Sequence, residues 1–148
     1  MEDAPPLVLL VDDDNDHAEL VMRSLSEHPI LNRVIRLANG EMVLDYLFRR
    51  GDYTNPALSP RPQLILLDLR LPRISGLEVL QTLKASEALR PIPIVIFTTS
   101  DAEQDVVRAY QYHANSYLVK PLDFAQFTRL IEEVGIYWLT LNRRMREP

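Results

Sequence analysis

Polar side chains that could do chemistry stand at the ends of four short apolar runs. In chain order they are Asp12, Asp13, Asp68, Thr98, Thr99 and Lys120. Such runs predict buried strands of a parallel sheet. The carboxyl ends of parallel strands meet at one edge of the sheet, where open α/β sheets bind ligands. We therefore expect these side chains to converge, although the sequence separates them widely.

Three carboxylates close together repel one another unless a cation neutralises them, and hard oxygen ligands favour Mg²⁺. A carboxylate beside Mg²⁺ can attack a phosphoryl group and form an aspartyl-phosphate. Lys120 and the Thr98 hydroxyl could then contact the phosphoryl oxygens. Each residue also has a simpler interpretation. Asp13 or Asp14 could cap a helix, Thr98 could be a turn hydroxyl, and Lys120 could be a solvated charge.

The rest of the chain supplies the elements that would position this group. Strands are expected at 7–11, 32–37, 64–67, 94–97 and 115–119. A helix follows each strand, with starts indicated by an N-cap at Asn39, the pair Ser75-Gly76, a capping box from Ser100 to Glu103 and a cap at Asp123. This alternation predicts an α/β fold with a five-stranded parallel sheet, right-handed crossovers and five helices. Residues 51–62, rich in Pro, Gly, Asn and Ser, predict a long loop.

Composition narrows the possible functions. Hydrophobic residues make up 47 % of the 148, which is enough for the core of one domain. The formal net charge of -5 argues against a nucleic-acid partner, and the absence of cysteine excludes disulfides and thiolate chemistry. No apolar run is long enough to span a membrane, and the first six residues lack the features of a signal peptide. We expect a cytoplasmic protein.

The pattern resembles the receiver domain of two-component response regulators over nearly the whole chain. The residues that carry the resemblance are Val11-Asp12-Asp13, Leu67-Asp68 followed by Pro72 and Gly76, Thr98, Tyr117 and Lys120-Pro121. The resemblance implies a doubly wound, flavodoxin-like sheet with strand order 2-1-3-4-5. It also implies a phosphoryl acceptor rather than an enzyme, with only self-phosphorylation and self-dephosphorylation at Asp68. In that family the peptide bond before the proline that follows the lysine is often cis.

Roles for individual residues follow from the resemblance. Asp68 would be the phosphoacceptor, and Asp12, Asp13, Asp68 and the backbone carbonyl of Arg70 would hold Mg²⁺. The residues expected to bind the phosphoryl group or to switch with it are Thr98, Thr99, Lys120 and Tyr117. Thr99 stands where a smaller residue is common, so it is expected to narrow access to the pocket.

A narrower likeness is to the single-domain receivers associated with phytochrome-type histidine kinases. It is carried by the long proline-containing loop, the Thr98-Thr99-Ser100 run and the Tyr137-Trp138 pair. Residues 1–148 would then form one receiver domain, with a flexible N-terminus at 1–6 and the last helix and tail at 123–148. The expected partner is a sensor histidine kinase such as a bacterial phytochrome, with no nucleic acid or membrane partner.

The apolar seam of the last helix suggests a symmetric homodimer formed by the fourth helix, the last strand and the last helix, since large aromatic residues often anchor interfaces. Its members are Phe127, Ile131, Val134 and Trp138, with Leu141 beyond them. The alternative is that Trp138 folds back on its own domain.

Two other functions compete with the receiver. The run 8–14 also fits the haloacid-dehalogenase phosphatase pattern, with Asp12 as nucleophile and Asp14 as general acid. That enzyme would leave Asp68 and Pro72 without a role, and it needs further acidic metal ligands after Lys120. A binding module with a vestigial acidic pocket is the third possibility, and the complete set of acidic, hydroxyl and lysine side chains argues against it.

Overall fold

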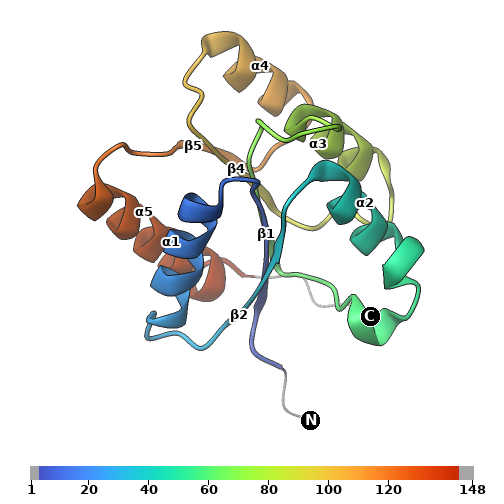
Figure 1. Cartoon of the computed structure of the whole chain (residues 1–148), viewed down its shortest axis with the longest axis horizontal. Helices are drawn as coiled ribbons and strands as arrows, with labels where there is room; N and C mark the ends of the chain where they lie inside the picture. Colours follow the sequence, from blue (N-terminus) through green and yellow to red (C-terminus); the bar gives the residue numbers. More distant parts are fainter. Residues whose placement is uncertain (1–3, 144–148) are drawn as a thin grey trace.

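A computed structural model describes residues 4–143 and contains one five-stranded parallel sheet. The strands are β1 (Leu7–Val11), β2 (Arg33–Leu37), β3 (Leu64–Leu67), β4 (Ile94–Thr98) and β5 (Ser116–Val119). They lie in the order β2-β1-β3-β4-β5 (Figure 1), which confirms the predicted α/β fold and its strand order.

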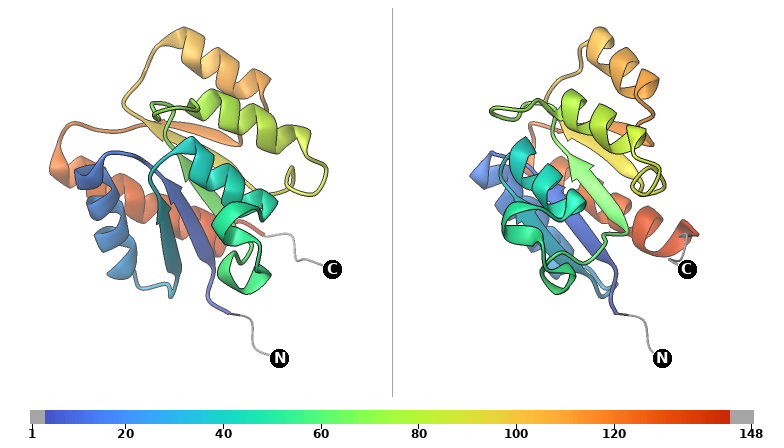
Figure 2. Two further views of the ribbon diagram at one scale, coloured as in Figure 1. Left: turned by 45° about the vertical axis from the view of Figure 1, so that its right-hand side comes forward. Right: turned by 90° about the vertical axis from the view of Figure 1, so that its right-hand side faces the viewer.

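A helix follows each strand, as predicted. The helices are α1 (Asn15–Ser26), α2 (Gly40–Phe48), α3 (Gly76–Ala85), α4 (Glu103–Gln111) and α5 (Phe124–Ile136). Helices α1 and α5 cover one face of the sheet, and α2, α3 and α4 cover the other (Figures 1 and 2). No helix within residues 4–143 is both long and apolar enough to cross a membrane.

The core divides between the two faces with the two-residue period of a strand. Val8 and Leu10 of β1 pack on the α1 and α5 side, whereas Leu9 and Val11 pack on the α2 to α4 side. The same alternation runs through β3 and β4. Asp12 and Asp68 continue the series that faces α1 and α5, and Thr98 continues the opposite series.

Side chains cap four of the helices. Asp14, Asn39, Ser75 and Asp123 each accept backbone N–H groups in the first turn of the helix that follows. The predicted capping box at Ser100 is wrong, because α4 begins later, at Glu103. Its N-cap is Ala102, and the Ser100 hydroxyl instead donates to Asp105 at 2.6 Å and accepts the Ala102 N–H at 3.3 Å.

The long loop at 51–62 packs against the end of α2. It contains two 3₁₀ turns, η1 (Gly51–Tyr53) and η2 (Pro56–Leu58). The rings of Tyr53 and Tyr46 lie 5.2 Å apart between centroids, and the Tyr46 hydroxyl donates to the Pro60 carbonyl. The loop is therefore an ordered cover for α2, on the side of the molecule away from the carboxyl ends of the strands.

The apolar seam of α5 belongs to the core of its own domain. Phe127, Ile131 and Val134 are buried against α1 and the sheet, so the predicted homodimer interface through these three side chains is wrong. Trp138, in the π-helical turn Tyr137–Leu141, is half-buried against the same cluster. Side chains that are buried in the core of their own domain cannot also contact a second copy of the chain. Residues 1–3 and 144–148 of the predicted N-terminus and tail lie outside the described residues.

Candidate phosphoryl-transfer site

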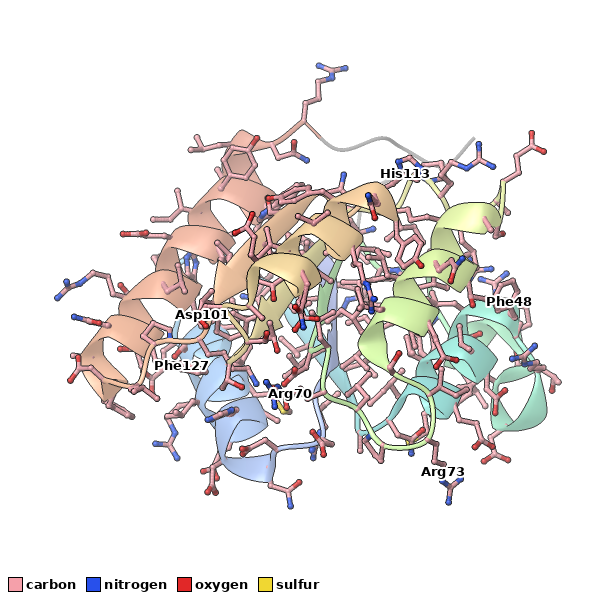
Figure 3. All side chains as sticks on the ribbon, turned by 90° about the horizontal axis from the view of Figure 1, so that it is seen from above. Phe48, Arg70, Arg73, Asp101, His113 and Phe127 are labelled. Atoms are coloured by element: carbon pink, nitrogen blue, oxygen red, sulfur yellow. The ribbon has the colours of Figure 1, made fainter. Side chains whose placement is uncertain are left out.

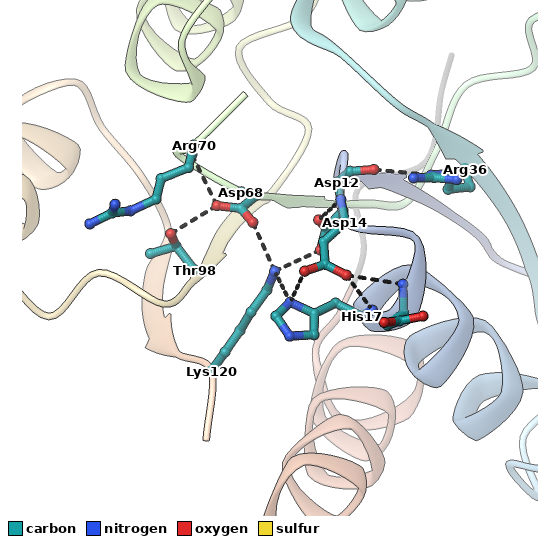
Figure 4. Close-up of polar contacts among 9 residues, drawn as sticks. Asp12, Asp14, His17, Arg36, Asp68, Arg70, Thr98 and Lys120 are labelled. Carbon is teal, nitrogen blue, oxygen red and sulfur yellow. Dashed lines mark hydrogen bonds and ion pairs between the residues drawn. The ribbon is translucent and has the colours of Figure 1, made fainter. Parts of the chain in front are cut away.

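Two buried carboxylates and one buried ammonium meet at the carboxyl edge of the sheet. Asp12 follows β1, Asp68 follows β3 and Lys120 follows β5, and their exposed fractions are 1 %, 6 % and 4 %. The Lys120 Nζ lies 2.7 Å from Asp12 Oδ2 and 2.8 Å from Asp68 Oδ2 (Figure 4). Since a buried charge is costly without a partner, this double ion pair offsets part of the cost of burying the three charged side chains.

The second oxygen of Asp68 is also bonded. The Thr98 hydroxyl, fully buried, donates to Asp68 Oδ1 at 2.8 Å, and the backbone N–H of Arg70 donates to the same oxygen at 3.0 Å. Three donors therefore surround the Asp68 carboxylate and fix its orientation. Donors placed in this way can stabilise negative charge that develops at this point.

Asp13 completes an acidic cluster. One carboxylate oxygen from each of Asp12, Asp13 and Asp68 lies within 4.8 Å of the other two, and Asp13 is exposed while the others are buried. Three negative charges face one lysine, so the cluster carries an uncompensated charge. The carboxylate donors and the open side at Asp13 suit a hard divalent cation that keeps several waters.

Two opposing effects act on the pKa of the Asp12 carboxyl group. Burial raises the pKa of Asp12 above the ordinary value, and the hydrogen bond and positive charge of Lys120 offset part of that rise. Its main chain is fixed as well, since Arg36 Nε donates to the Asp12 carbonyl at 3.0 Å. A cation at this site would favour the ionised carboxylate further.

His17 is a neighbour of Lys120 that the sequence analysis did not single out. His17 lies in the first turn of α1, and its Nδ1 is 3.0 Å from Lys120 Nζ (Figure 4). Asp14 lies beside it as the N-cap of α1, and the backbone hydrogen bond from His17 lowers the pKa of Asp14. The available signal was position: a polar residue one helical turn after a strand-end carboxylate lies near the same edge.

Other predicted site residues lie around this cluster rather than within it. Tyr117 is half-buried, and its hydroxyl donates to the Ser100 carbonyl at 2.8 Å, while burial raises its pKa. Thr99 is exposed and makes none of the side-chain hydrogen bonds found in residues 4–143. The Arg70 side chain is exposed in the loop between β3 and α3 (Figure 3). The Lys120-Pro121 peptide bond is trans.

Comparison with known proteins identifies the family. The model of the response regulator receiver domain matches residues 8–132. This chain belongs to that family. It is accordingly a receiver domain of the two-component type, and receiver domains accept phosphoryl groups rather than turn over a metabolite.

Two curated relatives match along most of their length. The probable methanogenesis regulatory protein FilR2 of Methanothrix harundinacea is 46 % identical over 139 residues, which cover 94 % of this chain and 87 % of FilR2. The response regulator Rcp1 of Synechocystis is 38 % identical over 135 residues, which cover 91 % of this chain and 90 % of Rcp1. The matched residues span most of both relatives and most of this chain.

Solved structures agree with the sheet order and the helix arrangement. The phosphorylated cyanobacterial phytochrome response regulator RcpA has a TM-score of 0.92 and 31 % identity, covering 97 % of this chain and all of RcpA. The Mn²⁺-bound form of Rcp1 has a TM-score of 0.91 and 36 % identity, covering 96 % of this chain and all of Rcp1.

The phosphatase alternative is not favoured. The family model spans the chain from β1 into α5, and the haloacid-dehalogenase pattern would need Asp14 as a general acid. Asp14 instead accepts the backbone N–H groups of Asp16 and His17, both at 3.0 Å, as the cap of α1. A carboxylate with a lowered pKa and two bound N–H groups is a poor proton donor.

Proposed function

We propose that Asp68 accepts a phosphoryl group from the phosphohistidine of a sensor histidine kinase. An oxygen of the Asp68 carboxylate attacks phosphorus, the new O–P bond forms, and the P–N bond breaks. The electron pair of that bond returns to the imidazole of the kinase, which takes up a proton. The observation that supports this role is the placement of Asp68 between two donors, Lys120 and Thr98, at the carboxyl edge of the sheet. Hydrolysis of the acyl phosphate by water would return the domain to its starting state.

Mg²⁺ is the proposed cofactor, held by Asp12, Asp13, Asp68 and the backbone carbonyl of Arg70. When bound, it would supply positive charge to the phosphoryl oxygens and reduce repulsion among the carboxylates. The support is the acidic cluster with its oxygens within 4.8 Å of one another, together with the Mn²⁺-bound state of Rcp1.

Lys120 and Thr98 would bind the phosphoryl group by exchanging partners. Both now donate to oxygens of Asp68 itself, at 2.8 Å each. After phosphorylation the negative charge lies farther out, on the phosphoryl oxygens, so the two donors would follow it. Movement of Thr98 would open space on the α4 side, and Tyr117 would respond because its hydroxyl is bonded to the loop between β4 and α4. Thr99, exposed next to Thr98, would limit access to the pocket.

The signal would leave the domain through the face formed by α4, β5 and the start of α5. This face carries exposed apolar side chains, namely Val107, Tyr110, Val119 and Leu122. We propose that it forms a homodimer or binds a partner, in place of the buried α5 seam. We also propose a phytochrome-type kinase as donor, supported by the likeness to RcpA, with residues 1–148 acting as one cytoplasmic receiver domain.

One experiment tests the proposed chemistry. The protein is treated with acetyl phosphate and Mg²⁺, and the modified residue is located by mass spectrometry after borohydride reduction. An adduct on Asp68 that disappears in Asp68→Asn and persists in the matched surface variant Asp16→Asn supports the receiver. Sustained turnover that depends on Asp12 would support a phosphatase instead, and no reaction at all would support a vestigial site.

A second experiment tests the output face. Sedimentation velocity over a range of concentrations is compared for the parent and for Tyr110→Glu, with and without beryllofluoride. If the sedimentation coefficient of the parent rises with protein concentration and that of Tyr110→Glu does not, the result supports the dimer. Identical behaviour of the two proteins would contradict it.

A further inference from the structure

The ammonium of Lys120 has three protons and three partners. Besides Asp12 Oδ2 at 2.7 Å and Asp68 Oδ2 at 2.8 Å, it contacts His17 Nδ1 at 3.0 Å. An ammonium can only donate, so the nitrogen of His17 that faces it must carry the lone pair. We therefore assign the acceptor role in this contact to His17 Nδ1, which places the ring proton on Nε2.

The His17 ring is held in place by aromatic packing. Its centroid lies 5.6 Å from that of Phe127 on α5, and Phe127 lies 5.2 Å from Phe97, edge to face. Lys120 Nζ in turn lies 5.7 Å from the centroid of Phe97. Lysine, histidine and two phenylalanines thus form a closed ring of contacts between α1, α5 and β4. An acceptor fixed in this way is already aimed at Lys120 before any ligand binds.

Asp14 does not compete for His17 Nδ1. Its Oδ2 lies 3.5 Å from that nitrogen, longer than a good hydrogen bond, whereas Lys120 Nζ lies at 3.0 Å. Asp14 Oδ1 is engaged with the backbone N–H groups at the start of α1. The lone pair of Nδ1 is therefore used by Lys120.

We propose that His17 is a positioning residue for Lys120, an inference that rests on the proposed transfer of a phosphoryl group to Asp68. Nδ1 holds the ammonium on the side away from Asp68, opposing the pull of the two carboxylates. On phosphorylation Lys120 exchanges one partner, Asp68 Oδ2, for a phosphoryl oxygen, and keeps Asp12 and His17. The ammonium can therefore contact the phosphoryl group while its contacts with Asp12 and His17 are kept.

Two nearly isosteric variants separate the acceptor from the packing. His17→Asn keeps an oxygen acceptor close to the position of Nδ1, and His17→Leu fills similar space without one. The readouts are the affinity for beryllofluoride with Mg²⁺, measured by ¹⁹F NMR, and the rate of Asp68 phosphorylation by acetyl phosphate. We expect His17→Leu to lose about tenfold in both, the effect of one hydrogen bond to a charged group, and His17→Asn to stay within about threefold of the parent.

Equal losses in both variants would show a packing role and overturn the proposal, as would an unchanged His17→Leu. A measurement on the parent keeps the test independent of variant folding: long-range ¹H–¹⁵N correlation of His17 must show an unprotonated Nδ1, and a proton there would also overturn it. The proposed function fails separately, if the parent forms no adduct at Asp68. The tautomer of His17 is readable in either case.

Discussion

Asp13→Asn should stabilise the metal-free domain and weaken the stabilising effect of magnesium. Asp13 is the exposed member of the acidic cluster, and its carboxylate oxygen lies within 4.8 Å of oxygens from both Asp12 and Asp68. In a water-like dielectric, two unit charges at this separation repel by about 1 kcal/mol. Removing two such repulsions should raise the free energy of unfolding by about 1 to 2 kcal/mol in EDTA at low ionic strength, and less at high salt.

Magnesium should act in the opposite direction. A ligand present at a hundred times its Kd stabilises the folded state by about 2.7 kcal/mol. If loss of the Asp13 charge weakens binding a hundredfold, the same concentration adds only about 0.4 kcal/mol to the variant. The response to magnesium should therefore differ by about 2 kcal/mol between parent and variant, which offsets or exceeds the gain seen in EDTA.

The assay is urea unfolding followed by far-ultraviolet circular dichroism, in EDTA and in saturating Mg²⁺. The matched control is Asp16→Asn, which removes an exposed acidic charge from the first turn of α1, outside the cluster. The control should keep the full magnesium response. If Asp13→Asn also keeps it, Asp13 is not a metal ligand and the electrostatic reasoning about the cluster is wrong.

Three further predictions concern Gly76 and Tyr117, which lie beside the site, and Lys84, which lies at the opposite edge of the sheet. Gly76→Ala should destabilise the domain by about 3 kcal/mol and slow phosphorylation of Asp68, because the new Cβ would lie 2.2 Å from the Asp68 carbonyl oxygen; an unchanged urea midpoint would contradict this. Lys84 donates to the carbonyls of Arg90 and Ile92 and to Asn115 Oδ1, and burial lowers its pKa to about 8. Between pH 8 and 10.5 the unfolded chain binds the extra proton, so the stability of the parent relative to Lys84→Met should rise with pH, by about 3 kcal/mol over the whole interval; parallel pH profiles of the two proteins would refute this. Tyr117→Phe should cost about 1 kcal/mol in urea unfolding, the worth of its hydrogen bond to the Ser100 carbonyl, and a loss near zero would show that the bond does not contribute.

Several features of the fold were predictable because they follow local rules. The two-residue alternation of β1 and β3 sorts their side chains between two helical layers, and short polar caps such as Asn39 and Asp123 mark helix starts. The capping box at Ser100 failed for a local reason too. Its pattern was present, but α4 begins later, and the hydroxyl found a closer acceptor in Asp105.

The seam of α5 shows where local rules stop. Its periodicity correctly indicated an apolar helix face, but periodicity cannot say what covers that face. In the structure α1 and the sheet cover Phe127, Ile131 and Val134, so the side chains assigned to an interface fill the core. Burial depends on contacts between distant segments, which a helical repeat does not encode.

The sequence by itself determined which chemical groups gather. Parallel strands place their carboxyl ends at one edge whatever the length of the connections, so polar residues after the apolar runs had to converge there. Only the tertiary structure decided how they are paired: Lys120 with Asp12, Asp68 and His17, and Thr98 with the other oxygen of Asp68. Pairing depends on ångström-scale distances set by the packing of α5 against α1. Those distances were needed to identify His17 as a partner of Lys120.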